Sequence, residues 1–324
     1  MNDWGRKPRV IAPGGGVRRG HGARAAWAES RRRIERGGPP PMPKTLLGHC
    51  WRPLRALVRR VDVARLMRGL YWRGVRNALD VRLLRLDLAL DGLPPAFDGY
   101  RILHITDPHL TRLDETAARI LACLDGVEAD LCVMTGDYGD GRRPDAQATV
   151  AALRPVIGAI RARDGILATL GNHDSLRLVA PIEALGARLL VNETVTLERG
   201  GDRVHVTGLD DVHHFYSEAA PAALDAAPDG FRIALVHSPE IAGRAAAAGF
   251  ALYVTGHTHG GQVCLPGGRP IATNLRRHRR FASGLWRCGD MVGYTSRGAG
   301  VSFLPLRFNS FGEVTLFTLR RARR

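Results

Sequence analysis

The sequence predicts an α/β fold in which two packed sheets are flanked by helices. After residue 80, short apolar runs alternate with stretches of helical periodicity, which is the pattern of parallel β-α-β units. The region Met291–Leu319 instead has successive strand-like runs separated by turns, which predicts a second, more antiparallel sheet. A chain of 324 residues accommodates one such domain and an N-terminal extension.

The predicted elements follow one another from Val81. Helices are predicted over Ala117–Gly126 and over residues 145–161, and alanine-rich helical stretches separate the later strands. Short apolar runs predict the strands Val81–Leu90, Arg101–Thr106, Asp130–Thr135, Gly165–Leu170, Val204–Thr207, Arg232–Val236 and Leu252–Thr255.

The N-terminal quarter is strongly basic. Residues 1–85 contain 21 of the 47 Lys and Arg but only 5 of the 31 Asp and Glu, so the formal net charge of +16 falls entirely there. Residues 1–43 are rich in Gly, Pro and Arg and have no sustained apolar period, so they are predicted to be disordered. A translation start at Met42 is an open alternative, which a protein fragment beginning before Met42 would refute.

Residues 44–80 are predicted to form a basic amphipathic helical segment. Apolar residues such as Leu54, Leu57 and Leu70 recur at helical spacing, while arginines occupy the other face. Two interpretations remain open: residues 51–80 bind an anionic membrane surface, or they pack on the domain with a solvated basic face. No uncharged apolar stretch approaches the roughly 20 residues of a bilayer span, and the five cysteines have no CxxC spacing. We therefore expect a cytoplasmic protein that is free or peripheral on the inner face of the membrane.

Short polar segments rich in carboxylate, imidazole or amide groups lie at the ends of apolar runs. Loops at the carboxyl ends of strands converge on one crevice in α/β sheets, so these groups are expected to meet. Asp107 and His109 can face one ion, with Pro108 expected to hold Asp107 in extended geometry. The carboxylate of Asp137 can bridge two ions. The segments are Asp107-Pro108-His109, Gly136-Asp137, Gly171-Asn172-His173-Asp174, His237 and Gly256-His257-Thr258-His259.

Oxygen and imidazole ligands without thiolate predict two divalent metal ions, with manganese favoured and iron or zinc as alternatives. The ordered motifs resemble the D-x-H, G-D, G-N-H-[DE], H and G-H-x-H motifs of the calcineurin-like metallophosphoesterase superfamily. The resemblance implies the metallo-dependent phosphatase fold, a four-layer α-β-β-α sandwich of two mixed sheets, within a domain of residues 81–324. It implies one metal site of Asp107, His109, Asp137 and His259 and a second of Asp137, Asn172, His237 and His257.

Two ions about 3.5–4 Å apart would activate a bridging hydroxide for in-line attack on phosphorus. His173 is the candidate for stabilising or protonating the leaving group. The resemblance implies that Asp140 orients His173, and the alternative is that Asp140 caps its loop. Arginines near the last motif are expected to hold a diphosphate or acidic head group, or to remain solvated. These arginines are Arg276, Arg277, Arg279, Arg280 and Arg297. By default, His104, His205, His213, His214 and His278 are interpreted as structural or surface residues.

Within the superfamily, the chain resembles the bacterial branch of membrane-associated phosphodiesterases and UDP-2,3-diacylglucosamine hydrolases of lipid A biosynthesis. The resemblance rests on Gly208-Leu209-Asp210-Asp211, on residues 256–262 and on residues 304–308. It implies hydrolysis of a phosphodiester or pyrophosphate bond, with UDP-2,3-diacylglucosamine as a candidate lipid-linked substrate. The alternatives are a nuclease or nucleotide phosphodiesterase of the same superfamily and a non-catalytic scaffold. Nucleic acid is not expected because the catalytic part is charge-balanced, and no protein partner is implied.

Overall fold

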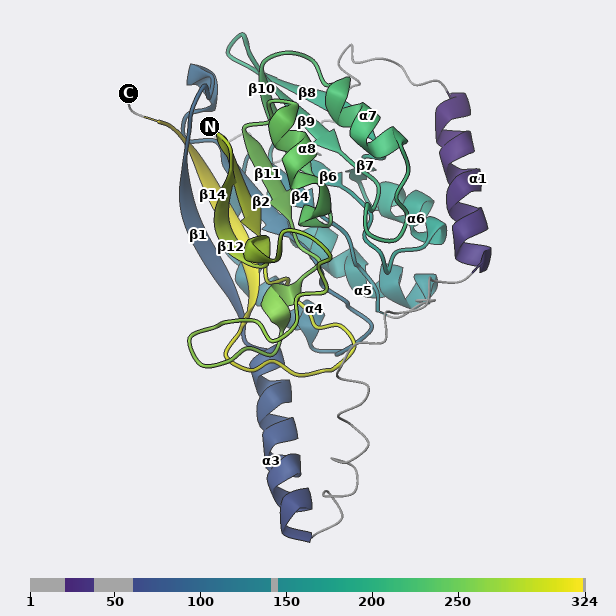
Figure 1. Ribbon diagram of the computed structural model, residues 1–324, viewed down its shortest axis with the longest axis vertical. Helices are drawn as coiled ribbons and strands as arrows, with labels where there is room; N and C mark the ends of the chain where they lie inside the picture. Colours follow the sequence, from purple (N-terminus) through teal and green to yellow (C-terminus); the bar gives the residue numbers. More distant parts are fainter. Residues whose placement is uncertain (1–20, 38–60, 141–144, 323–324) are drawn as a thin grey trace.

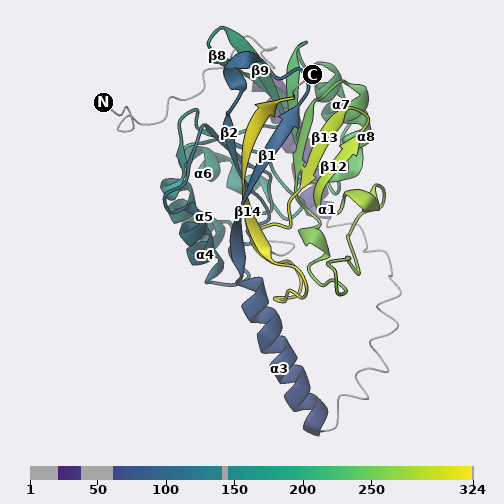
Figure 2. The same ribbon diagram turned by 90° about the vertical axis from the view of Figure 1, so that its left-hand side faces the viewer.

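The computed structural model describes residues 21–37, 61–140 and 145–322. Two six-stranded sheets pack face to face, and helices cover the outer face of each, so the layers run α-β-β-α (Figure 2). This arrangement confirms the predicted fold class. The first sheet is covered by α4 (Thr116–Leu124), α5 (Ala146–Ala159) and α6 (Val179–Ala184), and the second by α7 (Ala219–Asp225) and α8 (Ala242–Ala247). Single 3-10 turns are formed by Pro95–Phe97, Leu176–Leu178, Pro239–Ile241, His259–Gly261 and Arg279–Phe281.

The first sheet has the strand order β1-β14-β2-β4-β6-β7. All neighbours are parallel except β14 and β2, which are antiparallel. Its strands are β1 (Val81–Leu90), β14 (Gly312–Arg321), β2 (Arg101–Ile105), β4 (Leu131–Met134), β6 (Ile166–Ala168) and β7 (Ala187–Leu189). A separate two-stranded sheet pairs β3 (Glu128–Ala129) with β5 (Arg161–Ala162).

The second sheet has the strand order β12-β13-β11-β10-β9-β8. Its four inner strands are parallel, and β12 and β8 are antiparallel edges. Its strands are β12 (Gly284–Cys288), β13 (Met291–Thr295), β11 (Leu252–Thr255), β10 (Phe231–Leu235), β9 (Asp202–Gly208) and β8 (Glu193–Arg199). The prediction that the C-terminal tail forms a sheet of its own is therefore wrong. Its strands are divided, because β13 extends the second sheet while β14 inserts between β1 and β2 of the first.

The strands alternate their side chains between two apolar layers. On β10, Ile233 and Leu235 point into the core between the sheets, while Ala234 packs in the core beneath α7 and α8. On β2, Ile102 faces the central core and Leu103 faces α4 and α5. Side chains of adjacent strand residues point to opposite faces, so uninterrupted apolar runs indicate sheets buried on both faces.

Helix α5 begins where the sequence predicted a helix. The side chain of Asp145 caps its first turn by accepting hydrogen bonds from the backbone N–H groups of Gln147 (2.9 Å) and Ala148 (3.2 Å). Such a cap satisfies backbone N–H groups that have no partner within the first turn of the helix.

Helix α1 (His21–Gly37) lies on the surface beside α6, so the prediction of disorder is wrong for these residues (Figure 1). Its contacts with the domain are mostly polar, with Trp27 also packed against the apolar core, and their partners are distant in sequence, so apolar periodicity did not reveal the helix. The rest of the segment predicted to be disordered, including Met42, lies outside the described residues.

Helix α3 (Val61–Ala78) projects from the body like a stalk (Figure 1). Its last turns meet the domain: Arg307 N–H donates to Gly74 O (3.0 Å), and Asn77 Nδ2 donates to Arg307 O (3.0 Å). Residues 44–60 of the predicted amphipathic segment lie outside the described residues, and the division of the chain at residue 81 stays a prediction. Among the described residues, no helix combines the length and apolarity needed to cross a bilayer.

Candidate metal centre

Two clusters of buried side chains lie at the carboxyl ends of strands from both sheets. Within each cluster, the nitrogen and oxygen atoms that could bind a metal all lie within 4.8 Å of one another. One cluster consists of Asp107, His109 and His259, and the other of Asp137, His237 and His257. The structure thus brings together groups that are as far apart in the sequence as Asp107 and His259.

In the first cluster, two imidazoles meet nitrogen to nitrogen. His109 Nε2 lies 3.2 Å from His259 Nε2 and 3.5 Å from Asp137 Oδ2. His259 Nε2 lies 3.5 Å from Asp107 Oδ1. The four groups of the first predicted metal site therefore converge on a single point.

The second cluster shares Asp137 with the first. His237 Nε2 lies 3.3 Å from Asp137 Oδ2 and 3.1 Å from Asn172 Oδ1. His257 Nδ1 lies 2.8 Å from Asn172 Oδ1 and 3.2 Å from His237 Nε2. Asp137 Oδ2 thus faces His109 of the first cluster and His237 of the second. This is the position expected for a carboxylate that bridges two metal ions. The roles of these residues as ligands stay predictions.

Neighbouring backbone and hydroxyl groups orient the candidate ligands. His237 Nδ1 is 2.7 Å from the carbonyl oxygen of Thr135, so Nδ1–H donates there and Nε2 faces the cluster. The hydroxyl of Thr106 donates to Asp107 Oδ2 at 2.7 Å. Such outer contacts set the tautomer and direction of metal ligands.

The backbone is strained at five candidate ligands. Positive φ values are uncommon for residues other than glycine, and they concentrate at functional sites. The values are 49° at Asp107, 40° at His109, 59° at Asp137, 72° at His257 and 52° at His259. The expectation that Pro108 keeps Asp107 extended is wrong, because the strand ends in a left-handed residue that turns the carboxylate into the cluster.

Glycines allow the loops to pass close to the carboxylates. A Cβ on Gly171 would collide with the carboxylate of Asp137, and one on Gly256 would collide with the carboxylate of Asp107. Any side chain at either position would therefore displace a candidate ligand.

Asp174 is a functional residue that the sequence motif contained but to which no role was assigned. Its buried carboxylate accepts hydrogen bonds from the N–H groups of Asp137 (2.6 Å), Tyr138 (2.9 Å) and Gly171 (2.8 Å). Burial, and then the charge of Asp137, raise the pKa of Asp174 to about 6. Asp174 therefore ties the loop after β4 to the loop after β6.

The charges of the site suit cations. Burial alone would lower the pKa of His237, but the carboxylates of Asp137 and Asp107 outweigh it and raise this pKa to about 10. Burial, and then the positive charge of His237, lower the pKa of His257 well below its usual value. For His259 the same direction results from burial and then from His109. The centre thus favours positive charge beside Asp137, and it keeps the imidazoles of His257 and His259 neutral, so that their nitrogen lone pairs can bind a metal. The residues therefore fit two divalent ions bound by oxygen and nitrogen.

His173 and Asp140 are partly exposed and lie next to the buried candidate ligands. The backbone N–H of His173 donates to Asp137 Oδ1 at 2.8 Å, and its ring centroid is 5.1 Å from that of His109. Asp140 Oδ1 lies 3.4 Å from His109 Nδ1, and Asp140 Oδ2 lies 3.2 Å from Arg112. Asp140 therefore supports a candidate ligand directly, and its predicted orientation of His173 stays a prediction.

The predicted substrate-binding arginines are placed differently from one another. Arg276, Arg277, Arg279 and Arg280 are exposed on the loop before β12. Arg297 instead pairs with the buried Glu313 at 2.8 Å, which gives it a structural role. Contacts of these arginines with substrate stay predictions.

Two histidines interpreted by default as structural or surface residues belong to the site region. The ring of His213 lies 4.4 Å from that of His257, and His214 follows it in the chain. The loop is held by Asp211, whose carboxylate accepts from the N–H groups of His213 (3.1 Å) and His214 (2.6 Å). The acidic pair Asp210-Asp211, which shortly precedes these histidines, is the sequence feature that could have indicated their place near the site. His104, in contrast, is a buried structural residue that contacts Thr135 Oγ1 at 2.8 Å.

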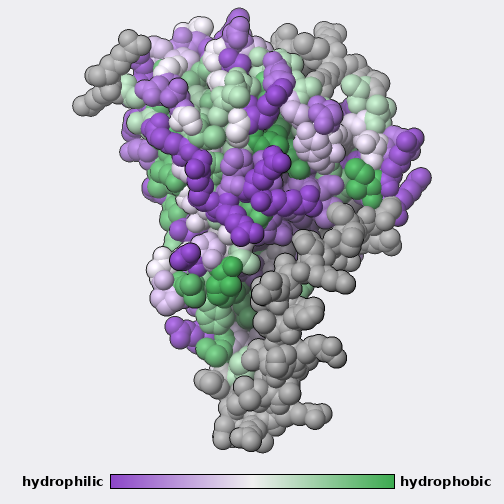
Figure 3. Space-filling view, in the orientation of Figure 1, coloured by the Kyte–Doolittle hydropathy of each residue, from purple (hydrophilic) through white to green (hydrophobic). Residues whose placement is uncertain are grey.

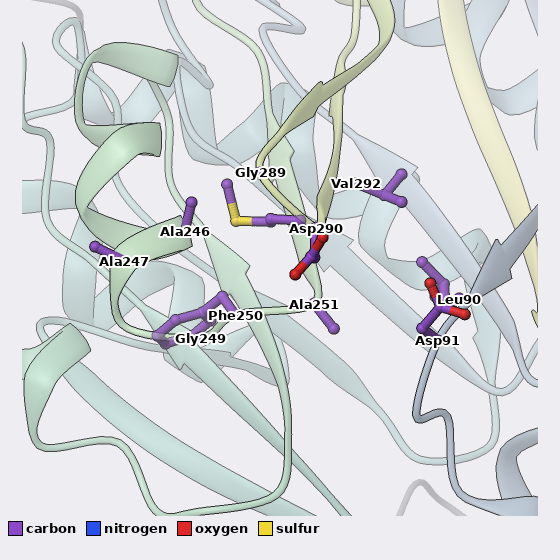
Figure 4. A pocket seen from close by; sticks show the side chains of 11 residues that line it. Leu90, Asp91, Ala246, Ala247, Gly249, Phe250, Ala251, Gly289, Asp290 and Val292 are labelled. Atoms are coloured by element: carbon purple, nitrogen blue, oxygen red, sulfur yellow. The ribbon is translucent and has the colours of Figure 1, made fainter.

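A hollow elsewhere on the molecule does not add to this centre (Figure 4). It lies between the end of β1, the turn before β11 and the turn between β12 and β13, at the ends of β11 and β13 away from His257. Its lining is mostly small or apolar, with the carboxylates of Asp91 and Asp290 and no imidazole.

Comparison with known proteins identifies the family. The sequence profile of the calcineurin-like phosphoesterase family matches residues 100–261. The chain is 30% identical over 236 residues to the uncharacterized metallophosphoesterase YkuE of Bacillus subtilis (strain 168), covering 70% of this chain and 82% of the relative. It is 27% identical over 230 residues to the phosphodiesterase YaeI of Escherichia coli (strain K12), covering 68% and 82%. It is 29% identical over 167 residues to a probable cyclic nucleotide phosphodiesterase of Rhodococcus erythropolis (strain PR4 / NBRC 100887), covering 43% and 52%. The chain therefore belongs to the calcineurin-like phosphoesterase family, whose members are metal-dependent hydrolases of phosphate esters.

Proposed function

We propose that the protein hydrolyses a phosphodiester or pyrophosphate bond in a lipid-linked substrate while resting on an anionic membrane. UDP-2,3-diacylglucosamine is the candidate compound, and the inner face of the cell membrane is the proposed location. The observation that carries this proposal is an exposed apolar pair, Phe303 and Leu304, which we call the apolar rim and whose backbone is hydrogen-bonded to Arg112 and Gln262 near the candidate ligands. Phe303 is 75% exposed and Leu304 is 37% exposed.

Hydrogen bonds connect the apolar rim to the catalytic loops. Arg112 donates to the carbonyl oxygen of Phe303 and pairs with Asp140 at 3.2 Å. Asp140 in turn lies 3.4 Å from His109. The side chain of Gln262, three residues after the candidate ligand His259, donates to the carbonyl oxygen of Leu304 at 2.5 Å. A lipid-linked substrate whose acyl chain lies on this rim would have its phosphate at the metal centre.

Helix α3 supports the membrane part of the proposal. Met67, Leu70, Tyr71 and Trp72 are 39–55% exposed, and Arg68 on the same helix is exposed as well. Figure 3 shows hydrophobic side chains along the helix and where it meets the body. Apolar and basic side chains on one projecting helix suit an interface with anionic lipid.

The chain's own residues provide the remaining chemistry. Two divalent ions, for which we propose manganese held by the residues of the two clusters, would supply Lewis acidity and lower the pKa of a water molecule. His173 is next to Asn172 and is proposed to donate a proton to the leaving oxygen. The exposed loop that carries Arg276, Arg277, Arg279 and Arg280 is proposed to contact the polar head of the substrate. The backbone N–H of Arg276 donates to Glu240 Oε1 at 2.7 Å.

Nucleotide phosphodiester hydrolysis is the second candidate. The chain is similar to a probable cyclic nucleotide phosphodiesterase of Rhodococcus erythropolis, which favours this candidate. His213 lies against His257, and together with His214 it could bind a nucleotide base or a second phosphate. Such a substrate would need neither α3 nor the apolar rim.

A substrate comparison tests the proposal. The protein carrying Phe303→Ser and Leu304→Ser should keep its activity on bis(p-nitrophenyl) phosphate and lose at least about tenfold in kcat/KM on a lipid-linked diphosphate. Leu285→Ser is the matched control, because Leu285 is also an exposed apolar residue but lies on β12. Equal activity of the double variant and the control on the lipid substrate would refute the role of the rim.

Flotation with vesicles tests the membrane part separately. Wild-type protein should float with vesicles that contain anionic phosphatidylglycerol at low salt, and Met67→Ser with Leu70→Ser should reduce the bound fraction. No flotation of the wild-type protein would remove the membrane from the proposal and leave the hydrolase standing.

A further inference from the structure

Helix α1 inserts a buried arginine behind the loop that carries Asn172 and His173. The side chain of Arg31 is 1% exposed. Its Nη2 donates to the carbonyl oxygens of Asp174 (2.6 Å) and Gly171 (3.2 Å), which flank Asn172 and His173. Backbone carbonyls on both sides of the loop are therefore held by one guanidinium.

The same guanidinium reaches a second loop of the site. Arg31 Nη1 pairs with Asp210 Oδ1, and the guanidinium carbon lies 3.8 Å above the ring centroid of Phe215. The backbone N–H of Asp211 donates to Asp210 Oδ1 at 2.9 Å, and Asp211 holds the turn that carries His213. Arg31 thus joins the loop after β6 to the loop that places a histidine against His257.

Other residues of α1 fasten the helix at both ends of this contact. Trp27 Nε1 donates to Asp210 Oδ2 at 2.7 Å. Glu35 Oε1 accepts a hydrogen bond from the backbone N–H of Leu176 at 2.8 Å and lies 3.5 Å from Arg31 Nε. The contacts extend along the helix from Trp27 to Glu35, so docking of α1 as a whole accompanies insertion of Arg31.

Loss of the guanidinium would leave several groups without partners. Asp210 is buried, and burial raises its pKa, an effect that the charge of Arg31 opposes. A buried carboxylate without its cation and carbonyls without a donor relax towards water. Both carbonyls belong to the loop that carries Asn172 and His173, so this loop is the one expected to shift.

We propose that α1 is a positioning element that docks in cis on the catalytic loops. In this role Arg31 is a positioning residue that holds Asn172 at the metal centre and His173 at the leaving group. The inference rests on the proposed roles of those two residues and not on the identity of the substrate.

The test compares Arg31→Ala with Arg33→Ala in the full chain, using bis(p-nitrophenyl) phosphate and manganese. Arg33 is the matched control because it lies on the same helix, is 78% exposed and pairs only weakly with Glu29 at 3.6 Å. Arg31→Ala is expected to lower kcat by about 10- to 100-fold with less than about a twofold change in KM, as expected for misplaced catalytic groups. It should also weaken manganese binding by about tenfold, the loss typical of outer-sphere supports.

Chemical rescue separates positioning from simple loss of fold. Added guanidinium should restore at least about a third of the lost activity of Arg31→Ala, while methylammonium should restore none, because only guanidinium matches the fork between Asp210 and the two carbonyls. Arg33→Ala should match wild type in kcat and in manganese binding.

Wild-type kcat and manganese affinity in Arg31→Ala would overturn the proposal. A loss that guanidinium does not rescue, accompanied by a lower melting temperature, would also overturn it and assign Arg31 a role in the fold alone. Failure of the lipid proposal would leave these results unchanged, because the probe substrate carries no lipid.

Discussion

Asp137→Asn is the sharpest perturbation of the metal centre. The substitution preserves the shape of the side chain and keeps an oxygen that can accept the N–H of His173, now 2.8 Å away. It removes the charge of Asp137 Oδ2, which faces His109 at 3.5 Å and His237 at 3.3 Å. The change therefore isolates the negative charge between the two clusters.

The magnitude follows from how strongly this position favours a cation. Asp137 is the first of the carboxylates that raise the pKa of His237 from 6.5 to about 10, which corresponds to roughly 5 kcal/mol in favour of positive charge there. Because Asp137 contributes more to this preference than Asp107 does, its loss should lower manganese affinity by about 50-fold or more. Because both ions are expected to share this carboxylate, kcat/KM should fall by about 1,000-fold.

The assay combines manganese titration by calorimetry with hydrolysis of bis(p-nitrophenyl) phosphate. Asp125→Asn is the matched control, because Asp125 is exposed at the end of α4. The metal-free Asp137→Asn protein should remain folded by circular dichroism at the assay temperature, so that lost turnover is not explained by unfolding. Turnover and metal affinity equal to those of the control would refute the bridging role of Asp137.

Three further predictions concern single groups of the site. Because the folded state raises the pKa of His237 from 6.5 to about 10, the proton of His237 stabilises the metal-free fold. In urea denaturation with EDTA, this contribution to the free energy of unfolding should be present in full below pH 6.5 and should be lost as the pH rises towards 10. A free energy of unfolding that rises across this window would contradict the raised pKa. His173→Ala should lose about 10-fold in kcat on an aryl phosphodiester but about 100-fold or more on an alkyl one, whose poor leaving group needs the proton; equal losses would exclude proton donation. Asp174→Asn should lower the free energy of unfolding by about 3 kcal/mol, because its carboxylate accepts three buried N–H groups, and a loss no larger than in Asp125→Asn would show that the loops hold without it.

Local sequence patterns predicted the parts of the fold that depend on local chemistry. The strand Val81–Leu90 was predicted with the bounds that it has in the structure, and the strand predicted from Arg101 begins at that residue. Strand ends followed by carboxylate, imidazole or amide groups predicted which side chains would meet, since parallel strands deliver their carboxyl ends to one edge.

The remainder depends on tertiary contacts that no local pattern carries. The strands β13 and β14 lie in the same C-terminal region, yet their sheet membership depends on partners far along the chain. Helix α1 has few apolar residues, and Arg31 finds its partners Asp210 and Asp174 more than 140 residues away. The positive φ of Asp107 likewise results from the crowded junction of two loops, against the local preference that Pro108 imposes.

The most direct test of the central claim is a crystal structure of the manganese-loaded protein with anomalous diffraction data. Two anomalous peaks per chain are expected, both within ligand distance of Asp137, one also bound by His109 and His259 and the other by Asn172, His237 and His257. A single peak, or two peaks that do not share Asp137, would contradict that claim.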